Sequence, residues 1–203
     1  FPGSSPFVET EMVEEDLTRI LARVKEVSQQ VDILVVAIHW GILYGWRASF
    51  QDELADYQPE LAKKLIDAGA SIIVGNHPHY PQGIERYNNG LIFYSLGLFS
   101  MHHVSLSGEN GALLRSFPAY DYPALLTAEI TRYNFVAKLS FDKDGGVSDC
   151  TLVPFHLSEI GESTFANRSE ADRLLGHLKD SSARFGTQLS LKENDGIFEY
   201  SLR

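Results

Sequence analysis

Hydrophobic positions near the start of the chain recur with the period of a helix. Between residues 14 and 27, apolar side chains spaced three and four apart occupy one face, with charged residues between them, which predicts an amphipathic helix. Residues 33–38 are six consecutive apolar residues, and an unbroken run of this kind indicates a strand buried on both faces, as in parallel sheets. Polar and conformationally special residues follow at once: His39, Trp40 and Gly41.

The same helix–strand unit is repeated further along the chain. A second helical stripe begins at Pro59, a residue suited to the first turn of a helix, and Gly69 marks its end. Residues 71–75 form another short β-branched run, and two more histidines follow it closely. The order helix–strand–helix–strand predicts an α/β layer, and open α/β sheets bind their ligands at the carboxyl ends of their strands.

The sequence after the second histidine-ended strand predicts mostly β-structure. An Asn-Asn-Gly segment at residues 88–90 stands between two apolar stretches, residues 83–87 and 91–95, and its Asn-Gly pair predicts a β-hairpin. Further strands are expected over residues 125–131, 134–141 and 147–155, a helix over 171–185, and two short strands within 188–203.

Composition and charge exclude several classes of function. The 203 residues include 17 Lys and Arg against 27 Asp and Glu, a formal net charge of −10. Without a basic cluster, such a chain is not expected to bind nucleic acid or an anionic membrane surface. The single cysteine, Cys150, excludes an intrachain disulfide and a cysteine-based zinc cluster. No apolar run approaches the ~20 residues of a membrane span, so we expect no direct membrane insertion by this chain.

Three of the seven histidines stand at the ends of predicted strands: His39 after the first, and His77 and His79 after the second. If the two strands are neighbours, all three imidazoles converge at one edge of the sheet. Pro78 restricts His77 to extended conformations, so we expect the side chains of His77 and His79 to point the same way. Imidazoles alone would suit zinc, manganese, nickel or iron. A purely structural role, with each ring hydrogen-bonded at its strand end, stays open beside metal binding.

Three other residues are weaker candidates for binding a substrate. Asn76 would contact the same site or cap the turn after the second strand. Trp40 would line a groove or pack in the core, and Arg47 is a candidate contact for an anion opposite the histidines.

Several short segments, taken in order, point to one family. They are His-Trp-Gly at residues 39–41, Gln-Pro-Glu-Leu-Ala at 58–62, Leu-Ile-Asp-Ala-Gly-Ala at 65–70, Gly-Asn-His-Pro-His at 75–79 and Tyr-Ser-Leu-Gly at 94–97. Together they resemble the bacterial CapA family of capsule or poly-γ-glutamate biosynthesis proteins, part of the calcineurin-like metallophosphoesterase superfamily. The similarity is continuous from about residue 14 to residue 99 and looser to about residue 187.

The resemblance implies an α/β fold with two packed β-sheets flanked by helices, of which this chain looks like the second half. Residues 1–13 would be a loop or linker, 14–187 the carboxyl-terminal portion of the domain, and 188–203 a tail. Because the chain starts at Phe1 rather than Met, we expect that a preceding half belongs to the full-length protein and is needed to complete the site. The family also implies a location at the bacterial cell surface, outside the cytoplasm.

The same resemblance implies a reaction and its ligands. His39 and His77 would bind one divalent metal ion and His79 a second, the metal being manganese, zinc or iron. Two such ions would act on a phosphoester or on an anionic polymer such as poly-γ-glutamate.

The chain departs from the family pattern in three ways. Leu43 stands where the family usually has Glu, and Leu98 where it usually has Asn. The aspartates, the asparagine–histidine pair and the bridging carboxylate of the superfamily's early motifs are absent from this chain. Two functions therefore stay open: a metal-dependent hydrolase when full length, and a non-catalytic binding or scaffold component of the capsule-polymer machinery. We expect this chain alone to bind metal weakly and to have little hydrolytic activity.

Overall fold

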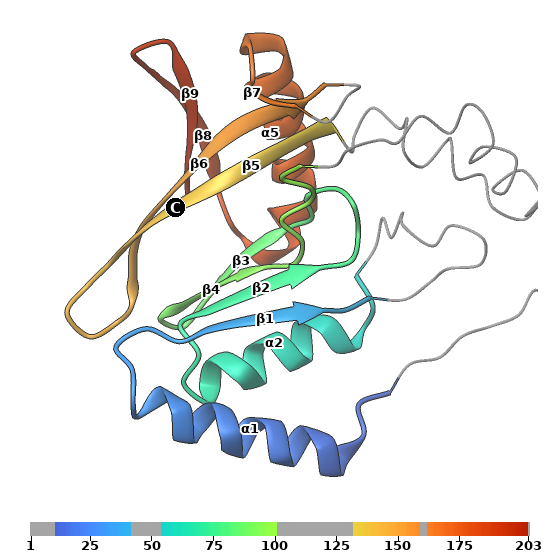
Figure 1. Ribbon diagram of the computed structural model, residues 1–203, viewed down its shortest axis with the longest axis vertical. Coiled ribbons are helices and arrows are strands. Elements are labelled where there is room, and N and C mark those ends of the chain that lie inside the picture. The colour runs from blue at the N-terminus through green and yellow to red at the C-terminus, as the bar shows by residue number, and fades with distance from the viewer. Residues whose placement is uncertain (1–10, 42–53, 101–131, 159–161, 203) are drawn as a thin grey trace, which may run out of the picture.

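A computed structural model describes residues 11–41, 54–100, 132–158 and 162–202. Two β-sheets pack against each other, and helices flank them (Figure 1). The predicted α/β fold with two packed, helix-flanked sheets is confirmed, and it is consistent with part of a metallophosphoesterase-like fold. The strand expected over residues 125–131 lies outside the described residues, as do Leu43 and Arg47.

The first sheet has four strands and carries the histidines. Its strands lie in the order β1 (Val35–His39), β2 (Ile72–Asn76), β4 (Gly90–Phe93) and β3 (Ile84–Tyr87). β1, β2 and β4 are parallel, and β3 is antiparallel to β4. The two strands predicted to end in histidines are therefore neighbours, as the convergence of those residues requires.

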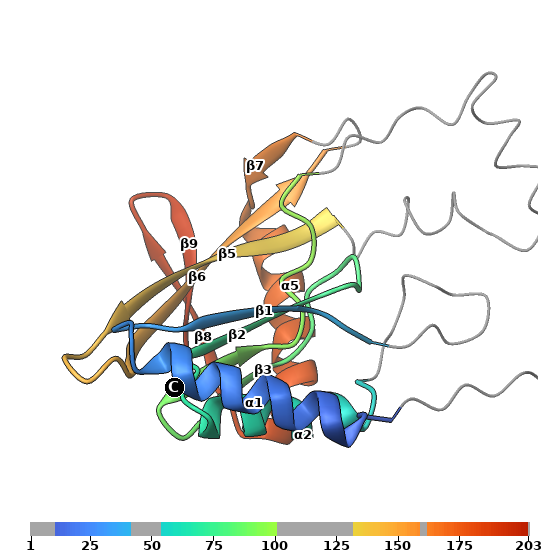
Figure 2. The same ribbon diagram turned by 60° about the horizontal axis from the view of Figure 1, so that its bottom comes forward.

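Two helices cover one face of this sheet (Figure 2). They are α1 (Glu14–Ser28) and α2 (Tyr57–Asp67). Their apolar stripes and the facing side of β2 and β4 form one hydrophobic core, which includes Val24, Leu65, Ile73 and Ile92. The stripe of α1 is only partly covered, since Leu17 and Val24 are buried while 46% of Ile20 is exposed.

β1 does not have the environment that its sequence predicts. The unbroken apolar run indicated a strand buried on both faces, but β1 is the edge strand of the sheet and 50% of Val35 is exposed. β2, by contrast, lies between two parallel partners and buries Ile72 and Ile73 almost completely. The expectation was wrong for β1 because only one of its faces is covered: Val36 and Ile38 pack against the helix side of the sheet, while Val35 on the other face lines an open groove.

The predicted hairpin forms, with its turn one residue earlier than the Asn-Gly pair suggests. β3 and β4 pair from Ile84–Phe93 to Tyr87–Gly90, which leaves Asn88 and Asn89 as the turn. The positive φ of 49° falls on Asn88. Gly90 is instead the first residue of β4, where a Cβ atom would lie 2.5 Å from Cδ1 of Ile66. A close approach of α2, and not the turn conformation, therefore explains this glycine.

The second sheet is antiparallel and has five strands. They are β5 (Tyr133–Phe141), β6 (Val147–Leu157), β7 (Ser163–Phe165), β8 (Leu189–Asn194) and β9 (Ile197–Leu202). Their order is β5-β6-β9-β8, with β7 paired to β6. The expected strands over 134–141 and 147–155 and the two within 188–203 are thus confirmed. The division of the chain at residues 13 and 187 stays a prediction.

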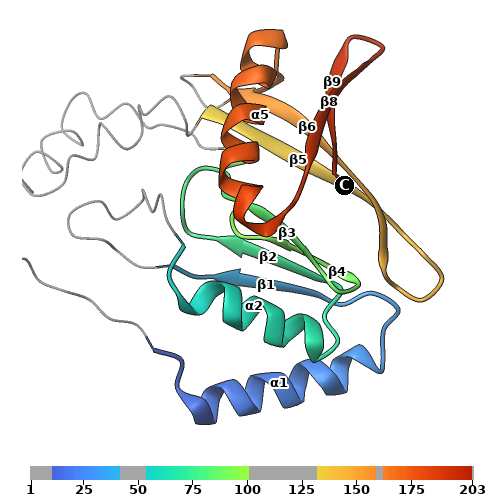
Figure 3. The same cartoon turned by 180° about the vertical axis from the view of Figure 1, so that it is seen from behind.

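One long helix closes the space between the sheets. α5 (Arg168–Ser182), followed by the short η2 (Ala183–Phe185), runs beside both sheets (Figure 3). Leu174 and Leu178 share one core cluster with Phe93 of the first sheet and Phe135 of the second. A hydrogen bond from the backbone N–H of Ile84 to Oγ of Ser182, 3.0 Å long, ties the helix to β3. The core therefore holds the two sheets in a fixed relation. None of the described helices is long and apolar enough to cross a membrane.

Candidate functional site

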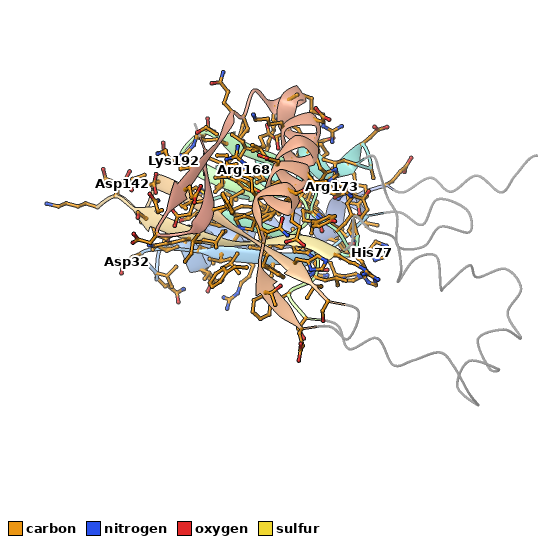
Figure 4. All side chains as sticks on the ribbon, turned by 90° about the horizontal axis from the view of Figure 1, so that it is seen from above. Asp32, His77, Asp142, Arg168, Arg173 and Lys192 are labelled. Carbon is orange, nitrogen blue, oxygen red and sulfur yellow. The ribbon has the colours of Figure 1, made fainter. Side chains whose placement is uncertain are left out.

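The histidines meet at the carboxyl ends of β1 and β2. His39 is the last residue of β1 and pairs in register with Asn76, the last residue of β2, and His77 comes next. The arrowheads of both strands point to the same side of the molecule in Figure 1. In Figure 4, His77 lies at this end, on the far side of the molecule from Asp32 and Asp142. The site is thus at the sheet edge that the sequence indicates.

His39 and His77 face each other directly. Nε2 of His39 lies 3.0 Å from Nδ1 of His77, the ring centroids are 4.9 Å apart, and the rings are inclined by 77°. Without a metal this contact is a hydrogen bond between two imidazoles. At the tetrahedral angle that zinc prefers, two nitrogen ligands about 2.1 Å from one ion would lie about 3.4 Å apart. The two nitrogens are about 0.4 Å closer than that, so a small separation of the rings would admit one metal ion.

His79 is close to this pair. Burial lowers its pKa, and the charges of His77 and then His39 lower the pKa further. The neutral imidazole, the form that binds metals, is therefore favoured at His79 down to a lower pH than usual. Among the described residues, however, no three or more His, Cys, Asp and Glu side chains have the geometry of a metal site. The described residues thus supply one preformed pair of nitrogen ligands with a third imidazole nearby.

The backbone of His77 differs from the sequence prediction. Pro78 was expected to hold His77 in an extended conformation. The φ of His77 is instead +134°, a value that residues other than glycine rarely adopt. Residues 77–80 bend sharply, and Oδ1 of Asn76 accepts the N–H of His77 at 2.7 Å. The His-Pro-His segment is therefore not extended as expected, although His77 does reach the site. Backbone strain of this kind costs on the order of 1–3 kcal/mol and is concentrated at functional sites.

This strain leads to a stability prediction. The His77→Gly protein should be about 1 kcal/mol more stable to urea than the His77→Ala protein, because glycine adopts a positive φ without strain and the relief exceeds its entropic cost. Unfolding of both variants is followed in the presence of a chelator. At His156, in the regular strand β6, the same comparison should favour alanine. If alanine is also the more stable residue at position 77, the backbone there is not strained.

The other sequence candidates take different places. Asn76 is exposed at the site, and its side-chain oxygen accepts the backbone N–H of His77, the first residue of the bend. Trp40 is only 4% exposed and packs on Tyr94 with ring centroids 5.7 Å apart. This environment corresponds to the packing role of Trp40 and not to a groove. Arg47, the candidate contact for an anion, lies outside the described part of the chain.

Two buried polar residues that were not named as candidates hold the backbone beside the site: Ser95 contacts the bend itself, and Asn134 holds the segment that follows Ser95. Oγ of Ser95 donates to the carbonyl of Pro78 at 3.0 Å, and Oδ1 of Asn134 accepts the N–H of Leu98 at 2.8 Å. Both Ser95 and Asn134 are fully buried. Ser95 belongs to the Tyr-Ser-Leu-Gly segment, which was the only signal in the sequence. No local pattern could indicate Asn134, because it comes from the other sheet.

A groove of about 490 Å³ opens beside the site, between the two sheets. It is lined mainly by apolar side chains, with Asn76 at the histidine end; others are Val35, Val74, Phe99, Phe135 and Val136. Of these, Val35, Phe99 and Val136 are also among the exposed large hydrophobic residues. An apolar lining does not suit an anionic polymer, so the groove is not a natural extension of the histidine site.

Comparison with known proteins gives a consistent set of matches. Residues 3–102 match the family described as Bacterial capsule synthesis protein PGA_cap. The chain is 45% identical over 76 residues to the PGA biosynthesis protein CapA of Bacillus subtilis, a match that covers 37% of this chain and 18% of that protein. It is 48% identical over 68 residues to the capsule biosynthesis protein CapA of Bacillus anthracis, covering 34% of this chain and 15% of that protein.

A longer match extends the similarity beyond the first sheet. The uncharacterised protein y4sH of Sinorhizobium fredii is 28% identical over 208 residues, which covers 90% of this chain and 44% of that protein. The chain thus spans less than half of the length of these curated relatives. The histidine pair, the bend at residues 77–80 and Ser95 all lie within the segment that matches the family.

Proposed function

Because the chain belongs to the bacterial CapA family of capsule synthesis proteins, we propose that its histidines bind a divalent metal ion used in making or exporting a capsule polymer. The observation that supports this most is the His39–His77 pair, with its nitrogen atoms 3.0 Å apart at the carboxyl ends of two parallel strands. Open α/β sheets bind ligands at this edge. The polymer class is poly-γ-glutamate, by analogy with the relative named PGA biosynthesis protein CapA.

The first form of this proposal is a metal-dependent hydrolase. Nε2 of His39 and Nδ1 of His77 would hold the ion, and His79 would join them or bind a second ion. Manganese, zinc and iron are all compatible with imidazole ligands. Once bound, such an ion supplies Lewis-acid chemistry for the hydrolysis of a phosphoester or of a bond in the polymer. The strained φ of His77 supports this form, since strain is retained where it serves a function.

The complete site would include residues outside this chain. The three imidazoles are neutral ligands, and they do not offset the charge of two divalent ions. Matched relatives are more than twice as long as the segment they share with this chain. The outer edge of β1, with which no described strand pairs, and the apolar groove beside it would also accommodate further structure from the full-length protein. We therefore expect the 203-residue chain to bind metal weakly and to hydrolyse little by itself.

The alternative to metal binding, which we call the scaffold form, is a non-catalytic binding or scaffold component. Leu98 supports it, because this residue replaces the usual asparagine of the family with a side chain that binds no metal. In this form the histidine pair is a structural hydrogen bond. Both forms place the protein at the bacterial cell surface, outside the cytoplasm, as the capsule-related names of its relatives suggest. With a net charge of −10, nucleic acid is not an expected partner.

A side-by-side assay separates these possibilities. The full-length protein and the 203-residue chain are each tested with added manganese or zinc, on a generic phosphodiester and on poly-γ-glutamate. The hydrolase form predicts turnover by the full-length protein, at least about tenfold less by the chain alone, and loss of turnover in the His77→Ala protein. Polymer binding without turnover would support the scaffold form. Equal turnover by both proteins would show that the rest of the protein is dispensable.

A further inference from the structure

The ends of three strands beside the histidines are fastened together by one side chain. Trp40 directly follows His39, and its backbone N–H donates to the carbonyl of Asn76 at 3.0 Å, which continues the β1–β2 ladder by one residue. Its indole Nε1–H reaches further and donates to the carbonyl of Tyr94 at 2.8 Å. Tyr94 directly follows β4, so the indole spans the whole width of β2.

Gly75 makes this crossing possible. A Cβ atom at position 75 would overlap the carbonyl of Tyr94 and Nε1 of Trp40, the two atoms that share the hydrogen bond. The glycine does not have a positive φ. Its role is therefore to let the indole pass close to the backbone of β2. The residue after Gly75 is Asn76, whose side chain supports the bend of His77.

Tyr94 is itself held at several points. Its ring stacks between Trp40 and Phe185, with centroid distances of 5.7 and 5.0 Å. Its hydroxyl donates to Oε2 of Glu85 at 2.6 Å, and Oε1 of Glu85 pairs with Nζ of Lys63 at 2.9 Å. The carbonyl that accepts the indole N–H thus belongs to a fully buried, well-fixed residue. A fixed acceptor gives the end of β1 a fixed position.

We propose that Trp40 is a positioning residue, which sets the imidazole of His39 opposite that of His77 by fastening the end of β1 across Gly75 to the end of β4. The inference rests on the proposed metal site. Among the described strands β1 is hydrogen-bonded to β2 alone, so an attachment to a second strand adds to what holds its last residue in place. The indole hydrogen bond is that attachment, one residue away from the ligand.

The test is zinc titration of the full-length Trp40→Phe protein by calorimetry. Phenylalanine keeps an aromatic ring against Tyr94 but lacks the N–H, so the attachment across Gly75 is lost together with part of the packing volume of the indole. Loss of a partner that orients a ligand typically lowers metal affinity 10–100-fold, and we expect about tenfold. The matched control is Tyr200→Phe. It removes a buried hydrogen bond, 2.6 Å long, from Tyr200 on β9 to the carbonyl of Ala171 on α5, and should leave zinc affinity unchanged.

A metal-free measurement distinguishes this inference from the metal site itself. In protein with labelled histidines and no metal, the nuclear Overhauser effect between the rings of His39 and His77 should weaken in the Trp40→Phe protein and persist in the Tyr200→Phe protein. If His77→Ala leaves zinc affinity unchanged, the proposed metal site is wrong. The nuclear Overhauser effect between the two rings then tests the role of Trp40 by itself. Unchanged ring contact in Trp40→Phe, or equal zinc losses in both phenylalanine variants, would overturn the inference. Should Trp40→Phe not fold, Tyr94→Phe, which releases Tyr94 from Glu85, is expected to act in the same direction.

Discussion

Replacing His77 with alanine should lower the affinity of the full-length protein for zinc more than about 100-fold. The substitution removes one of two facing nitrogen ligands whose atoms stand 3.0 Å apart, and no other described side chain is placed to replace it opposite His39. Loss of a residue that merely orients a ligand costs 10–100-fold, so loss of a ligand should cost more. His39→Ala should have an effect of similar size. Isothermal titration with zinc measures both.

The control for this prediction is a histidine away from the site. His156 lies on β6, with Nδ1 3.7 Å from Oε1 of Glu170, and His156→Ala should leave zinc affinity unchanged. His79→Ala should have a smaller effect than His77→Ala, since His79 is near the pair but not in ligand geometry with it. Equal affinity of the wild-type and His77→Ala proteins would show that zinc binds elsewhere.

The second large effect concerns a salt bridge behind the site. Lys63→Met should destabilise the protein by about 2 kcal/mol, since it leaves the carboxylate of Glu85 without its counter-ion. The side chain of Glu85 is only 7% exposed, and its two oxygens bind Nζ of Lys63 and the hydroxyl of Tyr94. Burial first, and then the bond to Glu85, raise the pKa of Tyr94 well above its usual range. The hydroxyl therefore remains a donor to Glu85 and cannot replace the lost positive charge.

The neighbouring lysine provides a matched control. Lys64 lies on the same helix and pairs with Glu60 at 2.6 Å, and the two side chains are 39% and 58% exposed. Lys64→Met should cost about 0.3–0.5 kcal/mol, the usual value of an exposed pair four residues apart on a helix. Methionine keeps the apolar stem and the helix propensity at both positions. Urea unfolding of the two variants measures the difference. Equal losses in the free energy of unfolding would mean that the buried carboxylate of Glu85 does not need Lys63 as its counter-ion.

The position of the histidines at one edge of the first sheet could be predicted, because it follows from local sequence patterns. Two short apolar runs, each preceded by a helical stripe, predict parallel neighbouring strands, and a histidine at the end of such a strand must lie at their common edge. The pairing of His39 with Asn76 is the direct result. The β8–β9 hairpin was likewise predictable, because it rests on an Asp-Gly turn.

The remaining features depend on contacts between distant parts of the chain. The positive φ of His77 is supported by Ser95, and Trp40 is held by a carbonyl 54 residues away. Gly90 is explained by Ile66 on α2, and not by the turn beside it. The exposure of β1 arises because Val35 faces an open groove between the sheets, which an apolar run does not reveal. Local sequence thus indicated where the site lies, but not how its backbone is held.

Anomalous diffraction at the zinc edge, from crystals of the full-length protein grown with zinc, tests the central claim most directly. We expect a peak bound by Nε2 of His39 and Nδ1 of His77, about 2.0–2.1 Å from each nitrogen. The two nitrogens, 3.0 Å apart without the ion, should separate by about 0.4 Å to reach the spacing of tetrahedral ligands. Zinc bound elsewhere, with His39 and His77 still hydrogen-bonded to each other, would contradict the claim and leave the pair with a structural role.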